Sequence, residues 1–216
     1  MIAAMWSGGK DSCLAVWRFV KSGGKVDRLI CMLNESGTSR AHRLSREALS
    51  RQAEAVGIEA VFGSSTWGGY REVLRGIVKE LGARRVIFGD IFLEEHRNWI
   101  EEFCSKIGVK PVFPLWGDDT LSLAEEFVSE GFEAYVVAIR KDIDVPILGK
   151  KFDEKLIETL LDAGIDPCGE NGEFHTFVAD GPLFRNRVEF RFGRVWKNEK
   201  YFVLEVHLTE DQNDLN

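Results

Sequence analysis

The stretch IAAMWSGGKDSCLAVWRFVK, residues 2–21, decides the fold. Its first part, Ile2–Trp6, is a short apolar run that predicts a buried strand, and the amphipathic stretch 11–22 predicts a helix. Between them lies SGGKDS, residues 7–12, whose two glycines favour a tight turn. A strand that passes through such a turn into a helix is the first half of a β–α–β unit, from which parallel sheets are built.

The alternation of strand and helix patterns continues through residue 118. Amphipathic stretches predict further helices near 41–56, 70–82 and 96–107. Short apolar runs predict strands at Arg28–Leu33, Glu59–Phe62, Arg85–Phe88 and Pro111–Leu115. This alternation predicts an α/β fold with a doubly wound, parallel, five-stranded sheet and right-handed crossovers.

After Trp116 the pattern changes. A helix (119–130) and a strand (133–139) are followed by a second helix near 153–163 and a glycine-bearing segment, 168–182. Two further strands, Arg187–Trp196 and Tyr201–Leu208, form a predicted hairpin. We therefore expect a smaller C-terminal α+β domain, 119–216, beside an N-terminal domain, 1–118. Because no low-complexity linker separates them, we expect the two to pack closely with a cleft between them.

The composition is that of an ordinary globular protein, with 44% hydrophobic and 29% charged residues among 216. No apolar run reaches the roughly 18 residues that cross a bilayer, and the start of the chain lacks the basic region of a signal peptide. We therefore expect neither a membrane partner nor secretion. The four cysteines include no CxxC pair, which argues against a zinc cage or a disulfide framework and favours a reducing, cytoplasmic location.

The net charge of −7 is unevenly distributed along the chain. Basic residues slightly outnumber acidic ones in the predicted N-terminal domain, whereas acidic residues outnumber basic ones about two to one in the predicted C-terminal domain. An acidic half argues against a nucleic-acid partner, since phosphate neutralisation supplies most nonspecific affinity for such polymers. The more basic half remains suited to one small anion, such as a nucleotide.

The SGGKDS loop combines the groups that hold a phosphate. Its two glycines allow successive backbone N–H groups to point at one anion, and the helix that follows presents its positive end. The lysine adds a full charge and the serine hydroxyls donate hydrogen bonds. The pattern is neither Walker A nor GxGxxG, and the alternative is an ordinary glycine-rich turn with a helix cap. The candidate binding residues are Ser7, Gly8, Gly9, Lys10, Asp11 and Ser12.

A second cluster of polar residues lies in CGENGEFHTFVADGP, residues 168–182. In an extended segment, alternation places Glu173 and His175 on one side and Thr176 on the other. Together with Glu170, these residues offer carboxylates, an imidazole and a hydroxyl to a cleft. The alternative is that this polar stretch is only turn chemistry.

SGGKDS at the end of a first strand resembles the PP-loop of the N-type ATP pyrophosphatases, whose fold is adenine nucleotide alpha hydrolase-like, of the HUP/Rossmann-like kind. The resemblance implies that domain 1–118 binds ATP and that cleavage falls between the α and β phosphates. It places Leu33 near the adenine and Gly89 beside the nucleotide. It also implies Mg2+ on the leaving pyrophosphate, with Asp11 and Asp90 as the carboxylates; the alternative role of Asp90 is a helix or turn cap.

SGGKDS and ENGEFHTFVADGP together resemble the family of diphthine–ammonia ligase and its ATP-binding relatives. The resemblance implies amidation of a carboxylate by ammonia through an acyl-adenylate, with AMP and pyrophosphate released. In that family the carboxylate belongs to diphthine, a modified histidine on elongation factor 2. The resemblance implies catalytic roles for Lys10, Glu170, Glu173 and His175, the last two toward the acceptor or the ammonia. It makes 119–216 the substrate-binding domain and leaves a homodimer open.

This chain departs from the ligases at one position of the second motif. The ligases resemble GEGGEYET where this chain reads GENGEFHT, so His175 replaces an acidic residue. A related group with the histidine form is proposed to amidate a corrinoid precursor in cobalamin salvage, which is one alternative function. A non-catalytic, ATP-binding regulatory module is another. Sulfur transfer to tRNA would need a basic C-terminal surface and paired cysteines, and the sequence has neither.

Other residues are open to two interpretations. His42 follows the second strand beside Arg40 and Arg43, and this group either meets the phosphates or the acceptor carboxylate or forms a solvated helix face. Cys168 is a candidate nucleophile without the second cysteine that a persulfide relay commonly needs. Three tryptophans are candidates to line the cleft: Trp67, Trp99 and Trp116.

Overall fold

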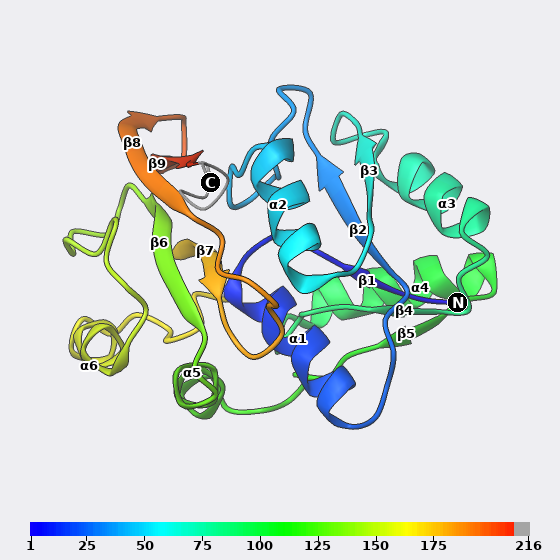
Figure 1. Cartoon of the computed structure of the whole chain (residues 1–216), viewed down its shortest axis with the longest axis horizontal. Coiled ribbons are helices and arrows are strands. Elements are labelled where there is room, and N and C mark those ends of the chain that lie inside the picture. Colours follow the sequence, from blue (N-terminus) through cyan, green and yellow to red (C-terminus); the bar gives the residue numbers. More distant parts are fainter. Residues whose placement is uncertain (210–216) are drawn as a thin grey trace, which may run out of the picture.

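Five parallel strands form the N-terminal sheet of the computed structural model, which describes residues 1–209 (Figure 1). The strands lie in the order β3-β2-β1-β4-β5, so the chain winds outward from β1 in one direction and then in the other. This confirms the predicted doubly wound sheet, whose order reverses between β1 and β4. The strands are β1 (Ile2–Met5), β2 (Arg28–Leu33), β3 (Ala60–Ser64), β4 (Arg85–Ile87) and β5 (Lys110–Val112).

Four helices cover the two faces of this sheet: α1 (Lys10–Lys21), α2 (Arg46–Val56), α3 (Tyr70–Glu80) and α4 (Glu94–Ile107). The alternating side chains of each strand divide the core into two clusters. Ala4 and Leu29 pack with α1 and α2 on one face. Ala3 and Ile30 pack with α3 and α4 on the other. Both faces are therefore buried, as a parallel sheet requires.

The helix predicted over 41–56 begins only at Arg46. Ser45 caps it, because the Ser45 hydroxyl accepts a hydrogen bond from the Ala48 N–H at 3.1 Å. The preceding residues form a loop in which Arg43 adopts a left-handed backbone, with φ of 58°. Arg40, His42 and Arg43 consequently belong to this loop and not to a solvated helix face.

The C-terminal part contains an antiparallel sheet in the order β7-β6-β9-β8. This arrangement confirms the predicted smaller α+β unit and its final hairpin, β8–β9, although β8 begins three residues later than predicted. The segment of the second motif that we expected to be extended is strand β7. The elements are α5 (Thr120–Ser129), β6 (Glu133–Arg140), α6 (Glu154–Asp162), β7 (Phe174–Asp180), β8 (Phe190–Lys197) and β9 (Tyr201–Leu208).

The two parts share one hydrophobic core. The cluster that contains Ala4 and Leu29 continues into Phe127 of α5 and Val178 of β7 without a break. The division at residue 118 remains a prediction, and the last residues of the predicted domain 119–216 lie outside the described ones.

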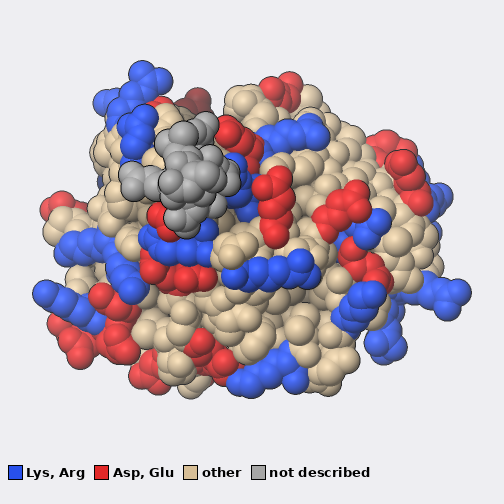
Figure 2. Space-filling view, in the orientation of Figure 1, with Lys and Arg blue, Asp and Glu red and all other residues tan. Residues whose placement is uncertain are grey.

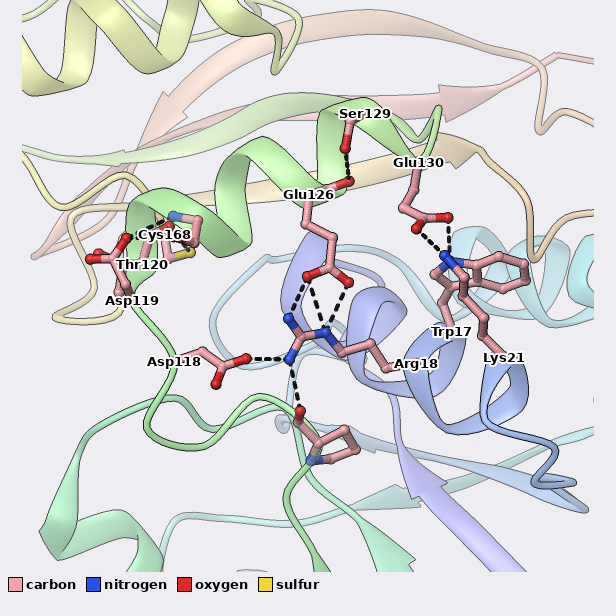
Figure 3. A network of polar contacts seen from close by, with 12 residues as sticks. Trp17, Arg18, Lys21, Asp118, Asp119, Thr120, Glu126, Ser129, Glu130 and Cys168 are labelled. Carbon is pink, nitrogen blue, oxygen red and sulfur yellow. Dashed lines mark hydrogen bonds and ion pairs between the residues drawn. The ribbon is translucent and has the colours of Figure 1, made fainter.

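A polar network joins helix α1 to helix α5 (Figure 3). The guanidinium of Arg18 donates to the carboxylates of Glu126 and Asp118, and its Nε–Oε1 distance to Glu126 is 2.9 Å. The indole of Trp17 donates to Glu130 at 2.9 Å. Partly exposed ion pairs of this kind typically add little stability, about 0–1 kcal/mol.

The surface carries charges of both signs. Over the face seen in Figure 2, lysine and arginine side chains alternate with aspartate and glutamate, and neither sign forms a large continuous area. Among residues 1–209, every helix is too short or too polar to cross a membrane.

Candidate functional site

A cavity of about 760 Å³ opens at the carboxyl ends of the parallel strands, where doubly wound sheets bind their ligands. Both sequence motifs line it, although they are more than 150 residues apart. The predicted site residues that line the cavity are Ser7, Lys10, Asp11, Ser12, Gly89, Asp90, Glu170 and His175. Two of the three candidate tryptophans line it as well, Trp67 and Trp99.

The SGGKDS loop turns sharply into helix α1. Gly8 has a φ of 82°, a conformation that favours glycine, and the Ser7 and Ser12 hydroxyl oxygens lie 3.1 Å apart across the turn. The end of strand β4 approaches closely, because a Cβ on Gly89 would lie 3.0 Å from the carbonyl carbon of Asp11. The loop is thus held tightly against the neighbouring strand.

Lys10 is a buried cation, with 3% of its surface exposed. Its Nζ donates to the two carboxylate oxygens of Asp11 at 2.7 and 2.9 Å and to the backbone carbonyl of Cys168. Burial is the largest single effect and opposes the charge, but the summed attraction of nearby acidic groups, Asp11 foremost, raises the pKa of Lys10. Lys10 therefore stays charged inside the cavity wall.

Strand β7 supports the SGGKDS loop from the other side. The Lys10 N–H donates to the Thr176 hydroxyl at 3.0 Å, and the Val178 N–H donates to the Gly8 carbonyl at 3.0 Å. Gln52 of α2 donates from its side-chain amide to the carbonyls of both Gly8 and Val178. The second motif thus contacts the loop directly, through both Thr176 and Val178.

Three carboxylates line the cavity: Asp11, Asp90 and Glu170. Glu170 Oε1 accepts a hydrogen bond from the Ile91 N–H at 2.9 Å, which fixes it beside the end of β4. Burial, together with the negative charges of Asp11 and Asp90, raises the pKa of Glu170 to about 7. Lys10 neutralises Asp11, so Asp90 and ionised Glu170 carry the negative charge that would attract a cation here.

The described residues contain no ready-made cluster of three metal-ligating side chains. Mg2+ does not require one, since it is commonly held by one or two carboxylates together with substrate phosphates. Asp11 and Asp90 both line the cavity next to the loop, and the oxygens of Asp11 already accept hydrogen bonds from Lys10. Asp90 Oδ1 also lies 3.4 Å from Nδ1 of His96, so Asp90 can pair with this imidazole when it is protonated.

Four predicted site residues do not line the cavity. Glu173 is 9% exposed, and its Oε2 atom is buried without a hydrogen-bond partner. Leu33 lies in the core, while Met32 beside it lines the cavity. The other two are Gly8 and Gly9, whose Cα atoms face Gln52 and His42. Their assigned roles remain predictions.

Cys168 is buried, and its thiol donates to the Thr120 carbonyl at 3.2 Å (Figure 3). Burial raises the pKa of this thiol well above its usual range. A reactive cysteine has a lowered pKa, so the structure argues against Cys168 as the nucleophile.

Sequence reasoning missed Gln52, whose side chain is completely buried. A signal was available: Gln52 falls one helical turn after Ala48, on the apolar face of α2. A polar residue on such a face needs a buried partner, and here the partner is the SGGKDS loop. Sequence reasoning also missed Tyr201, whose hydroxyl donates to the Gly172 carbonyl of the second motif at 2.9 Å, because no pattern links the final hairpin to that motif.

Residues 1–111 match the diphthamide synthase N-terminal domain, and residues 119–209 match the diphthamide synthase C-terminal domain. The chain belongs to the diphthamide synthase family. This membership confirms the resemblance drawn from the two motifs.

Several curated relatives are named diphthine–ammonia ligase. The protein from Bos taurus is 26% identical, with 87% of this chain and 81% of the relative covered. The protein from Danio rerio is 27% identical, with 87% and 85% covered. A solved structure of a predicted subunit of tRNA methyltransferase from Methanocaldococcus jannaschii aligns at 15% identity and a TM-score of 0.45, over 84% of this chain and 97% of that chain, which is too distant to inform function.

Proposed function

We propose that this protein is an ATP-dependent ligase that joins ammonia to a carboxylate through an acyl-adenylate, as a diphthine–ammonia ligase does. The observation that carries the proposal is that one cavity is lined by both the phosphate-loop residues and the second motif. Family membership and the names of the relatives support this reaction over the corrinoid and regulatory-module alternatives.

The loop residues are proposed to bind the phosphates of ATP. Lys10 supplies a charge that is already desolvated, and the Ser7 and Ser12 hydroxyls face the same cavity. Helix α1 adds the positive end of its dipole, and such fixed groups need little reorganisation during reaction. The adenine is proposed to lie near the end of β2, where Met32 reaches the cavity and Leu33 backs it.

Mg2+ is proposed to be held by Asp11 and Asp90, where it would neutralise charge on the leaving pyrophosphate. In the proposed reaction, an oxygen of the acceptor carboxylate attacks the α phosphorus, the bond to the bridging oxygen breaks, and pyrophosphate leaves. Ammonia then attacks the acyl carbon and AMP leaves. Lys10 is proposed to stabilise charge in the first step.

The acceptor is proposed to be diphthine on elongation factor 2, with Glu170, Glu173 and His175 on its side of the cavity. Glu170 and His175 line the cavity, which supports their roles. Glu173 lies behind them with a buried, unpartnered carboxylate oxygen and would act only after a local movement. The oligomeric state proposed is a homodimer, to be tested by mass measurement in solution.

The proposal is tested by incubating the protein with ATP, magnesium, ammonium chloride and elongation factor 2 that carries diphthine. We expect AMP, pyrophosphate and amidated acceptor in equal amounts, detected by chromatography and mass spectrometry. A corrinoid acid replaces the factor in a parallel reaction. If only the corrinoid acid is amidated, the acceptor is a corrinoid and not diphthine. ADP as the nucleotide product would refute the acyl-adenylate.

A further inference from the structure

Two imidazole rings meet in the wall of the cavity. The ring centroids of His42 and His175 lie 4.8 Å apart, and both residues line the cavity beside the phosphate loop. They come from distant parts of the chain, the loop before α2 and strand β7. Gly9 makes room for the pair, because a Cβ there would lie 2.0 Å from Cε1 of His42.

Hydrogen bonds define which nitrogen of each ring carries the proton. His42 Nδ1 lies 2.7 Å from the Thr176 carbonyl oxygen, which can only accept, so Nδ1 carries the proton. Nε2 is therefore bare, that is, unprotonated with a lone pair that can accept a hydrogen bond. The Tyr201 hydroxyl donates its proton to the Gly172 carbonyl at 2.9 Å. Its oxygen therefore accepts from His175 Nε2 at 3.3 Å, which leaves Nδ1 of His175 bare.

The surroundings keep both rings neutral. Burial lowers the pKa of His42 to about 4, despite the hydrogen bond to Thr176, and Lys10 lowers it further. Burial also lowers the pKa of His175 well below its usual range, with His42, Lys10, Lys200 and Arg43 adding to the effect. The positive charge around the two bare nitrogens disfavours a bound cation. An anion is disfavoured as well, because these nitrogens have no proton to donate to it.

We infer that His42 Nε2 and His175 Nδ1 form the binding site for the ammonia nucleophile. This inference rests on the proposed ligase function. A neutral molecule with several N–H groups matches two neutral acceptors, and ammonia keeps its lone pair free while it donates two hydrogen bonds. Ammonia bound beside Lys10 and the loop lies in the cavity where the acyl-adenylate would form.

The step balances with these groups alone. The ammonia nitrogen forms the new bond to the acyl carbon, and the bond from that carbon to the AMP oxygen breaks. The departing phosphate takes the electron pair of that bond together with one proton from the nitrogen. The imidazoles hold and orient the nucleophile and stay neutral throughout.

Substitution of each histidine by a residue with an amide side chain tests the ammonia site. In His42→Asn, the amide nitrogen replaces the donor to Thr176 while the bare nitrogen is lost. In His175→Gln, the amide nitrogen replaces the donor to Tyr201. Losing one hydrogen bond of this kind predicts a rise of about tenfold in KM for ammonium in each variant. Acceptor-dependent exchange of pyrophosphate into ATP, which needs no ammonia, should change much less than the KM for ammonium in both variants. His207→Gln, on the exposed part of β9, is the control.

An unchanged KM for ammonium, or an equal loss of pyrophosphate exchange, would overturn the site. Absence of exchange in the unaltered protein would instead refute the ligase reaction. Nitrogen NMR of the unaltered protein provides a readout without turnover: protons on Nδ1 of His42 and Nε2 of His175 are expected, and ammonium chloride in alkaline buffer should shift only the two bare nitrogens. Absence of that shift would also overturn the site.

Discussion

Gly9 and His42 pack so closely that a Cβ on Gly9 would lie 2.0 Å from Cε1 of the imidazole. Gly9 has an ordinary φ of −96°, so its backbone conformation does not require glycine. The lack of a side chain is needed for space alone. This contact joins the phosphate loop to the loop before α2 and, through His42, to Thr176 of β7.

Gly9→Ala should therefore displace His42 and destabilise the protein. Overpacking a filled site typically costs about 1–3 kcal/mol, which for a chain of this length lowers Tm by several degrees. Thermal unfolding followed by circular dichroism measures the change. Gly76→Ala is the matched control, because a Cβ at Gly76 meets nothing within 4 Å and alanine favours the helix. Equal Tm values for the two variants would contradict the tight contact.

Thr176→Val should weaken the link between the two motifs. The valine keeps the shape of the side chain but leaves the Lys10 N–H without its partner, at a cost of about 1–3 kcal/mol. The same denaturation experiment applies. In the control Thr159→Val, an exposed hydroxyl that bonds only within helix α6 is lost, and stability should hardly change. The prediction fails if Thr176→Val unfolds like the control.

Lys10→Ala should weaken ATP binding and turnover together, whichever acceptor is offered. The buried ammonium is the only positive charge that the SGGKDS sequence itself supplies, and loss of one preorganised group typically costs about 10²–10³-fold in rate. Calorimetric titration with ATP measures the binding. Lys25→Ala, which removes an exposed lysine, is the control, and Glu173→Gln should bind ATP normally because Glu173 does not line the cavity. Equal losses of affinity in Lys10→Ala and Glu173→Gln would contradict this division of roles.

The stability of the protein should fall in acid partly because of His42. Its pKa is lowered to about 4 in the folded state, so the unfolded chain binds this proton first as the pH drops. The contribution of the neutral ring is complete above about pH 6.5 and is lost between about 6.5 and 4, up to about 3 kcal/mol. His175 acts in the same direction.

Denaturant unfolding at a series of pH values measures this dependence. The difference in unfolding free energy between the unaltered protein and His42→Asn should shrink as the pH falls through that window. A constant difference across this window would show that the buried ring is not held neutral.

The sequence predicts the parallel sheet well, but it predicts less well where the loops end and the helices begin. Strands β1, β2 and β4 are short apolar runs, and such runs separated by amphipathic stretches have few other solutions. The start of α2 was predicted too early, because the Ser45 cap that begins it was not recognised behind an apparently continuous helical pattern.

The two motifs were recognised from sequence, but the contacts between them were not. Local spacing cannot show that Thr176 caps the Lys10 N–H, since the two residues are 166 positions apart and no pattern fixes how the domains pack. For the same reason Gly8 and Gly9 were assigned to phosphate approach alone, whereas their Cα atoms also face Gln52 and His42. Glu173 and Leu33 were placed at the site by position in the chain, and burial places them behind it.

Transfer of isotopic oxygen tests the central claim most directly. The acceptor carboxylate is labelled with ¹⁸O, and the reaction is run with ATP, magnesium and ammonium chloride. If the carboxylate attacks the α phosphorus, one ¹⁸O atom should appear in the phosphate of AMP for each amide formed, and none in pyrophosphate. Unlabelled AMP beside an amidated acceptor, or label in any other phosphate product, would contradict the acyl-adenylate on which this account of the cavity rests.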